Sequence, residues 1–185
     1  MFALVKRDVR SSEISEAASR DEIGATFRSA MVGHFRSHVP GTDINELTLL
    51  ASDYLNHFRK LVTLLEAASS QDSANDLLSW RPMSYEEHFS KSDFRDKALA
   101  IAAYRKAFTS FRPLFDEAVS RFHGEALALL TEISAELNDP DKNSSEINKT
   151  CANAARRLRV LIDEANTIVN GESPRRGVGA LFGIR

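Results

Sequence analysis

The chain has 185 residues, of which 43% are hydrophobic and 27% charged, and its formal net charge is -2. A chain of this length and composition is typical of one globular domain, and so small a charge selects neither nucleic acid nor an anionic membrane. The single cysteine excludes an internal disulfide, and the first ten residues lack the apolar stretch of a secretory signal, so we expect a cytoplasmic protein. The longest apolar run, residues 98–104, is too short to cross a bilayer.

A first helix is predicted for residues 21–38, where apolar side chains recur every three or four residues until the Pro-Gly pair at 40–41. A second helix is predicted for residues 43–69, with Asp43 and Glu46 as a capping box at its start. Its apolar stripe consists of Ile44, Leu47, Ala51, Tyr54, Phe58, Leu61, Leu65 and Ala68. Because the connection is short, we expect these two helices to be antiparallel neighbours.

Helical spacing returns over residues 95–137, where Pro113 predicts either two abutting helices or one kinked helix. A last long helix is predicted for residues 144–170. Asn143 is suited to cap its start, and Gly171 follows its end.

These elements predict an all-α fold, because the sequence shows no sustained two-residue alternation typical of strands. We expect a single domain, residues 1–171, in which four main helices form an antiparallel bundle. A long irregular crossover, about residues 69–93, joins the two halves and contains a short helical turn that Ser84 and Glu87 cap. Residues 172–185 are predicted to be a flexible C-terminal tail that folds back on the body or binds a partner.

Three of the five histidines precede a phenylalanine, whereas this composition gives about 0.3 such pairs by chance. Two of the pairs share the frame Tyr-x-x-His-Phe, at residues 54–58 and 85–89. The segments Asp-Tyr-Leu-Asn-His-Phe (53–58) and Trp-Arg-Pro-Met-Ser-Tyr-Glu-Glu-His-Phe (80–89) resemble a group of uncharacterised bacterial helical proteins. This resemblance implies a bacterial, cytosolic setting and brings no activity, cofactor or partner.

The spacing of the histidines argues against a metal site. Two pairs of side chains are four residues apart: His34 with His38, and Asp53 with His57. A di-iron site requires a glutamate three residues before each liganding histidine, and residue 85 is tyrosine. In the predicted hairpin, His34 and His57 differ in height by about 13 Å, against metal–nitrogen bonds of about 2 Å. We therefore expect no metal and no cofactor.

Residues 57–60, His-Phe-Arg-Lys, match the His-x-x-Lys core of histidine phosphotransfer modules, which are four-helix bundles with an exposed imidazole that accepts a phosphoryl group. Those modules place a small residue after the lysine, whereas Leu61 here belongs to the core stripe. Asp53, one turn before His57, is expected to hydrogen-bond the imidazole and to raise its pKa. Phosphotransfer by His57 is thus an alternative to a structural histidine at the edge of the stripe.

Other chemistries have little support in the sequence. Cys151 lies on the apolar stripe of the last helix, where a thiol behaves as a small hydrophobic side chain. Arginines cluster on the same helix, but no nucleic-acid recognition motif accompanies them.

The crossover is the predicted site of function, because Trp80, Tyr85 and Phe89 bring a large aromatic area into it and their burial is expected to fix its path. We predict a site for a small ligand or a protein partner formed by Asp53, His57, Trp80, Tyr85 and His88. The preferred function is a non-enzymatic binding, interaction or regulatory protein with neither nucleic acid nor membrane as a partner, and a homo-oligomer is left open. The alternatives are a histidine phosphotransfer module and a metal- or small-ligand-binding bundle.

Overall fold

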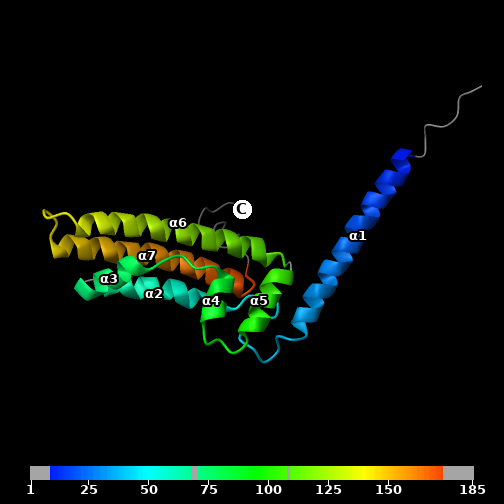
Figure 1. Ribbon diagram of the computed structural model, residues 1–185, viewed down its shortest axis with the longest axis horizontal. Helices are drawn as coiled ribbons and strands as arrows, with labels where there is room; N and C mark the ends of the chain where they lie inside the picture. The colour runs from blue at the N-terminus through cyan, green and yellow to red at the C-terminus, as the bar shows by residue number, and fades with distance from the viewer. Residues whose placement is uncertain (1–8, 68–70, 108, 173–185) are drawn as a thin grey trace, which may run out of the picture.

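The computed structural model describes residues 9–67, 71–107 and 109–172, and the regular elements in this part of the chain are helices (Figure 1). The elements in chain order are α1 (Val9–Arg36), the 3-10 helix η1 (Ser52–Tyr54), α2 (Leu55–Glu66), α3 (Gln71–Ser79), α4 (Tyr85–Lys91), α5 (Lys97–Lys106), α6 (Phe111–Leu137) and α7 (Ser144–Val169). Within the described residues there is no β-strand, only an isolated antiparallel bridge between Ile44 and Ala51. The predicted all-α class is confirmed.

Three helices form the centre of the fold. The chain direction is the same in α2 and α6 and opposite in α7, which packs against both (Figure 1). Phe58 of α2 stacks on Phe122 of α6, with ring centroids 3.9 Å apart. The face that α7 turns toward them carries mostly small or branched side chains, including Cys151, Ala154 and Leu158, all buried, so the helix axes can approach closely. The predicted apolar stripe of this helix is therefore core.

Both ends of α7 form as the sequence predicts. The Asn143 side chain accepts a hydrogen bond from the Glu146 backbone N–H, and the Glu146 side chain accepts one from the Asn143 N–H, a complete capping box. At the other end Gly171 has φ +83°. Its N–H donates to the Ile168 carbonyl and that of Glu172 to the Thr167 carbonyl, both at 3.0 Å, which is the Schellman pattern.

The disturbance predicted at Pro113 is a break between two helices. α5 ends at Lys106 and α6 begins at Phe111, so Pro113 lies in the first turn of α6. The first turn has no preceding carbonyl for a backbone N–H to reach, so proline costs little there. Of the two alternatives in the sequence, two abutting helices are correct.

The helix predicted for residues 43–69 is wrong in its first half. Residues 43–51 form a loop, because polar side chains bond the backbone there instead of leaving it to a helix. The Asn45 carboxamide oxygen accepts from the N–H groups of Leu47 and Thr48, both at 2.9 Å, and the Thr48 hydroxyl donates to the Val169 carbonyl at 2.7 Å. Leu49 has φ +60°, which no right-handed helix contains. The predicted capping box of Asp43 and Glu46 does not form.

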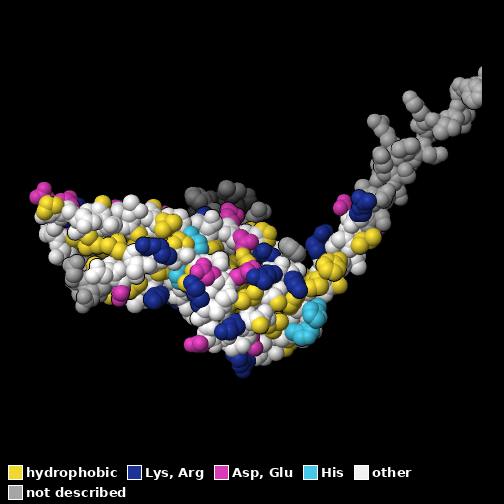
Figure 2. All heavy atoms as spheres, in the orientation of Figure 1, with side chains coloured by type: hydrophobic (Ala, Val, Ile, Leu, Met, Phe, Trp, Pro, Cys, Tyr) yellow, Lys and Arg dark blue, Asp and Glu magenta, His cyan; other side chains and the backbone are white. Residues whose placement is uncertain are grey.

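The first helix does not join the bundle, so the predicted four-helix antiparallel arrangement is replaced by a three-helix centre with shorter helices on it. α1 points away from the body, with apolar side chains exposed along it (Figures 1 and 2). Ile23 and Phe27 are each 66% exposed. The helix is attached at its C-terminal end, where Phe35 is buried and the Arg36 guanidinium donates to the carbonyls of Glu46 and Leu47.

The predicted irregular crossover is mostly helical, since it contains α3 and α4. The predicted cap of α4 is confirmed, because the Ser84 hydroxyl accepts from the Glu87 N–H. The part without regular structure is the short connection Trp80–Ser84. The predicted C-terminal tail, residues 172–185, lies outside the described residues except for Glu172.

No helix in the described part of the chain is long and apolar enough to span a membrane.

The ending of α7 can be tested with two glycine substitutions of opposite expected sign. Gly171→Ala should lower the free energy of unfolding by about 1–2 kcal/mol, because a left-handed conformation costs an L residue that much and the new Cβ would lie 2.6 Å from the Leu47 Cδ2 atom. Gly124→Ala, inside α6 with no atom within 4 Å of the new Cβ, is the control and should raise it by about 0.5–1 kcal/mol. Urea denaturation measures both, and stabilisation by Gly171→Ala would contradict the left-handed ending.

Candidate functional site

The five residues predicted to form a site come together at one end of α2. Asp53 lies in η1, His57 in α2 and His88 in α4, while Trp80 and Tyr85 lie before and at the start of α4. The ring centroids of His57 and His88 are 6.5 Å apart, although 31 positions separate them in the sequence. The predicted convergence of the two Tyr-x-x-His-Phe segments on one aromatic cluster is therefore observed.

Trp80 lies flat against His57. The two rings are nearly parallel, at 18°, with centroids 4.9 Å apart. The Trp80 indole N–H donates to the His57 backbone carbonyl at 3.3 Å, and Trp80 is only 5% exposed. The predicted burial of Trp80 is confirmed, and it fixes the connection between α3 and α4 on the surface of α2.

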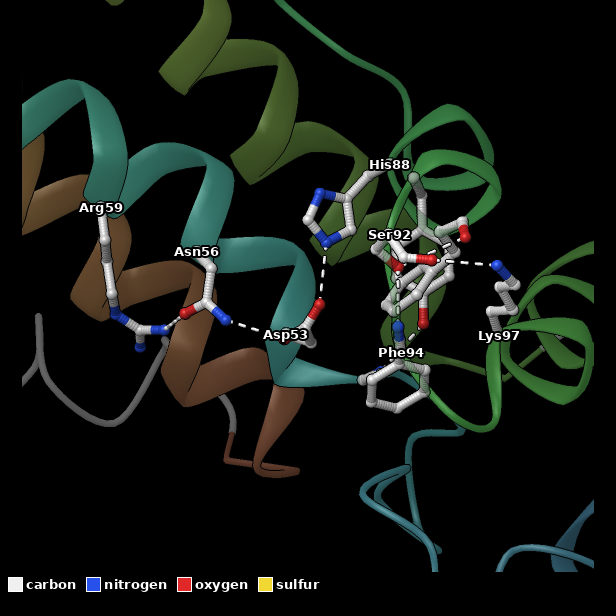
Figure 3. A network of polar contacts seen from close by, with 10 residues as sticks. Asp53, Asn56, Arg59, His88, Ser92, Phe94 and Lys97 are labelled. Atoms are coloured by element: carbon white, nitrogen blue, oxygen red, sulfur yellow. Dashed lines mark hydrogen bonds and ion pairs between the residues drawn. The ribbon is translucent and has the colours of Figure 1, made fainter.

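Asp53 pairs with His88 and not, as the sequence predicted, with His57. Its Oδ2 atom lies 2.9 Å from His88 Nε2, and its Oδ1 atom accepts from the Asn56 side chain at 2.8 Å (Figure 3). Asn56 in turn accepts from Arg59 at 2.9 Å. The prediction failed because Asp53 lies in η1 and not on one continuous helix with His57, and because the fold brings His88, 35 positions away, within hydrogen-bond distance of Asp53.

The two tyrosines of the repeated segments anchor the chain around the cluster. The Tyr54 hydroxyl donates to the Met83 carbonyl at 2.6 Å, and the Tyr85 hydroxyl accepts from the Ala51 N–H at 2.9 Å. Burial raises the pKa of both phenols far above the ordinary value, so they stay protonated. The tyrosine of each segment thus bonds the backbone just before the other segment. Each segment also places a phenylalanine, Phe58 or Phe89, in the core.

The His57 imidazole is held neutral by its surroundings. Burial lowers its pKa from 6.5 to about 4, with smaller contributions in the same direction from His88, His123 and Lys60, while a hydrogen bond to the Arg81 backbone opposes the shift. The predicted rise in the pKa of His57 is therefore wrong. Its Nε2 atom is buried without a hydrogen-bond partner among the described residues.

His123, which sequence reasoning missed, has a similar environment. It follows Phe122 on α6, burial lowers its pKa, and its Nε2 atom is likewise buried without a partner in the described part of the chain. Its ring centroid lies 6.4 Å from that of Trp80. The sequence signal that could have indicated His123 is its place directly after the apolar residue Phe122, whereas His57 directly precedes Phe58.

A cavity of about 350 Å³ opens beside the stacked rings, between α2, α3 and the connection Trp80–Ser84. Its lining includes His57, Lys60, Leu64, Asp76, Trp80 and Arg81. Of the five predicted residues, His57 and Trp80 line this cavity, whereas Asp53, Tyr85 and His88 are not part of its lining. Lys60, Asp76 and Arg81 were not among the predicted site residues.

Two other cavities lie elsewhere on the body. One of about 480 Å³ lies between α3 and α6, with Leu78, Arg81, Leu127 and Leu130 in its lining, so Arg81 lines both this cavity and the one beside Trp80. The other, about 290 Å³, lies at the base of α1. Neither contains a histidine or the tryptophan, so the Trp80 cavity, defined by the lining given above, is the candidate site.

The geometry does not suit phosphotransfer or metal binding. A phospho-accepting histidine must present a ring nitrogen to its partner, but Trp80 covers the His57 ring and Nε2 is buried. In the described residues no group of three or more His, Cys, Asp or Glu side chains is placed to hold a metal ion. Cys151 is buried and its pKa is raised by burial, so it makes a poor nucleophile.

No protein-family model, curated protein or solved structure matches this chain. The resemblance of residues 53–58 and 80–89 to a group of uncharacterised bacterial helical proteins stays a prediction. The candidate site therefore rests on its own geometry and chemistry.

The neutral state of His57 makes the stability of the fold depend on pH. Because its folded pKa is about 4 and its ordinary pKa 6.5, the unfolded chain takes up the proton more readily, and stability should fall as the pH drops from 6.5 toward 4. The midpoint of urea denaturation should fall between pH 7 and pH 4.5, and this fall should be smaller in His57→Gln than in the wild type. His34→Gln, at an exposed position on α1, should retain the wild-type loss. An unchanged loss in His57→Gln would show that His57 is not buried in its neutral form.

Proposed function

We propose that this protein is a non-catalytic binding protein that takes a small organic molecule in the Trp80 cavity. The observation that carries the proposal is a concave space of about 350 Å³ in which apolar and charged side chains face one another beside a buried indole–imidazole stack. Small-molecule sites in proteins have this size and this mixture of an apolar wall with a few polar groups.

The wall of the cavity is held in place without a ligand. Trp80 is fixed by its stack and its hydrogen bond on His57, and the backbone at Met83 by the Tyr54 hydroxyl. Ser84 then caps α4 directly after the connection. A site that is already ordered loses little conformational entropy when the ligand enters, which favours affinity.

Binding without catalysis suits the side chains of the cavity. The His57 imidazole is stacked and its pKa is about 4, far from the neutral range in which a general base works best. The hydroxyl in the lining belongs to Ser79 and donates to the Asp76 backbone carbonyl at 2.7 Å. A serine engaged in this way has no base beside it to activate it as a nucleophile.

The dye 8-anilinonaphthalene-1-sulfonate, which combines aromatic rings with a negative charge, is a direct probe. Trp80 is the only tryptophan of the chain, so excitation of the protein should produce energy transfer to a dye bound in the cavity. Leu64→Phe, which fills part of the cavity, should weaken this transfer about tenfold or more. Leu127→Phe changes the cavity between α3 and α6 and should leave it unaltered.

Equal titrations of the wild type and Leu64→Phe would contradict the proposed site. Loss of energy transfer in Leu127→Phe alone would instead indicate that the dye binds in the cavity between α3 and α6.

A further inference from the structure

We infer that the ligand of the Trp80 cavity is a small organic anion with an apolar body, bound by Lys60 and Arg81 through its charged group and by Trp80 through its apolar part. This inference rests on the proposed function and adds the chemical class of the ligand. Three features of the lining support it: an excess of positive charge, a cation already positioned by hydrogen bonds to the backbone, and an apolar wall.

The charges around the cavity do not balance. Lys60 and Arg81 contribute two positive charges and Asp76 one negative charge, while His57 contributes none at neutral pH because burial lowers its pKa. The described residues include no carboxylate that pairs with Lys60 or Arg81. Elsewhere on the bundle, several arginines have acidic partners, as in Arg105–Glu86, Arg121–Glu164, Arg157–Glu125 and Arg159–Glu66. An anion would give Lys60 and Arg81 an acidic partner such as these four arginines already have.

Arg81 is positioned for such a ligand before it arrives. Its Nη1 atom donates to the carbonyls of Leu78 and Trp80, both at 2.7 Å, at the C-terminal end of α3. A guanidinium group has five N–H donors, so these two bonds fix its direction and leave other donors for a carboxylate or a related oxyanion. Because the side chain is already ordered, binding costs less rotamer entropy than it would with a free arginine.

The remaining lining selects for an organic ligand over a simple inorganic ion. Leu64, Met83 and the indole of Trp80 form an apolar wall, whose contact with an apolar body removes both surfaces from water. The neutral His57 ring, which stacks on the indole, also lines the cavity.

Three probes with one ring and different charge test the class: cyclohexanecarboxylate, cyclohexanemethanol and cyclohexylmethylammonium. Each is titrated into the full-length protein while Trp80 emission is followed, and each competes against the naphthalenesulfonate dye. The carboxylate should bind about tenfold or more tightly than the alcohol, since a charge-assisted hydrogen bond contributes that much, and the ammonium should bind most weakly. Inorganic phosphate alone should not displace the dye.

The variant Lys60→Met tests whether the preference for the carboxylate over the alcohol arises in the Trp80 cavity. Lys60 is exposed, so the variant should fold with the thermal midpoint of the wild type. It should bind the carboxylate about tenfold more weakly and leave the alcohol unchanged. Lys149→Met removes the same charge from an exposed position on α7 outside the cavity and should change neither affinity.

The outcomes separate the two proposals. The anion assignment is wrong if the carboxylate binds no more tightly than the alcohol or the ammonium, or if Lys149→Met weakens it as much as Lys60→Met. In that case a dye signal that Leu64→Phe still removes would leave the proposed binding function standing. A dye signal that Leu64→Phe does not alter would overturn the binding site itself and, with it, the ligand class.

Discussion

The stacking of Phe58 on Phe122 is the contact around which the centre of this protein is arranged. The two rings are nearly parallel, at 12°, and fully buried, and they join α2 to α6 while α7 packs against both helices. Because His57 precedes one ring and His123 follows the other, the stack carries both imidazoles toward Trp80. The same packing that completes the core therefore takes two titratable side chains partly out of water and builds one wall of the candidate site.

Hydrophobic periodicity predicted the fold well where helices bury one continuous face, as in α7, whose capping residue Asn143 and closing Gly171 are local signals. It failed in the loop before η1, because apolar residues at helical spacing can also line a buried loop. The side chains of Asn45 and Thr48 decide between the two by bonding the backbone. It also failed for α1, since a pattern shows that Phe27 lies on an apolar face but not whether the body covers that face.

The candidate site was predictable in its aromatic half. The repeated Tyr-x-x-His-Phe frame indicated that His57 and His88 share a cluster, because both segments place histidine and tyrosine on the same helical side. The charged half was not predictable. Arg81 belongs to a connection whose path depends on tertiary contacts. The hydrogen bond between Asp53 and His88 likewise depends on how α4 packs against η1. Hydrophobic periodicity describes one helix at a time, so it does not indicate such contacts between residues far apart in the sequence.

The attachment of α1 at one end makes it a lever. A helix of 28 residues is about 42 Å long at 1.5 Å per residue, and its buried anchor, Phe35, lies next to its last residue. A change of only about 10° in its direction at this anchor would sweep the far end through about 7 Å. Arg36 is held by the carbonyls of Glu46 and Leu47. A small shift of that loop would therefore produce a displacement several-fold larger at the N-terminal end of α1.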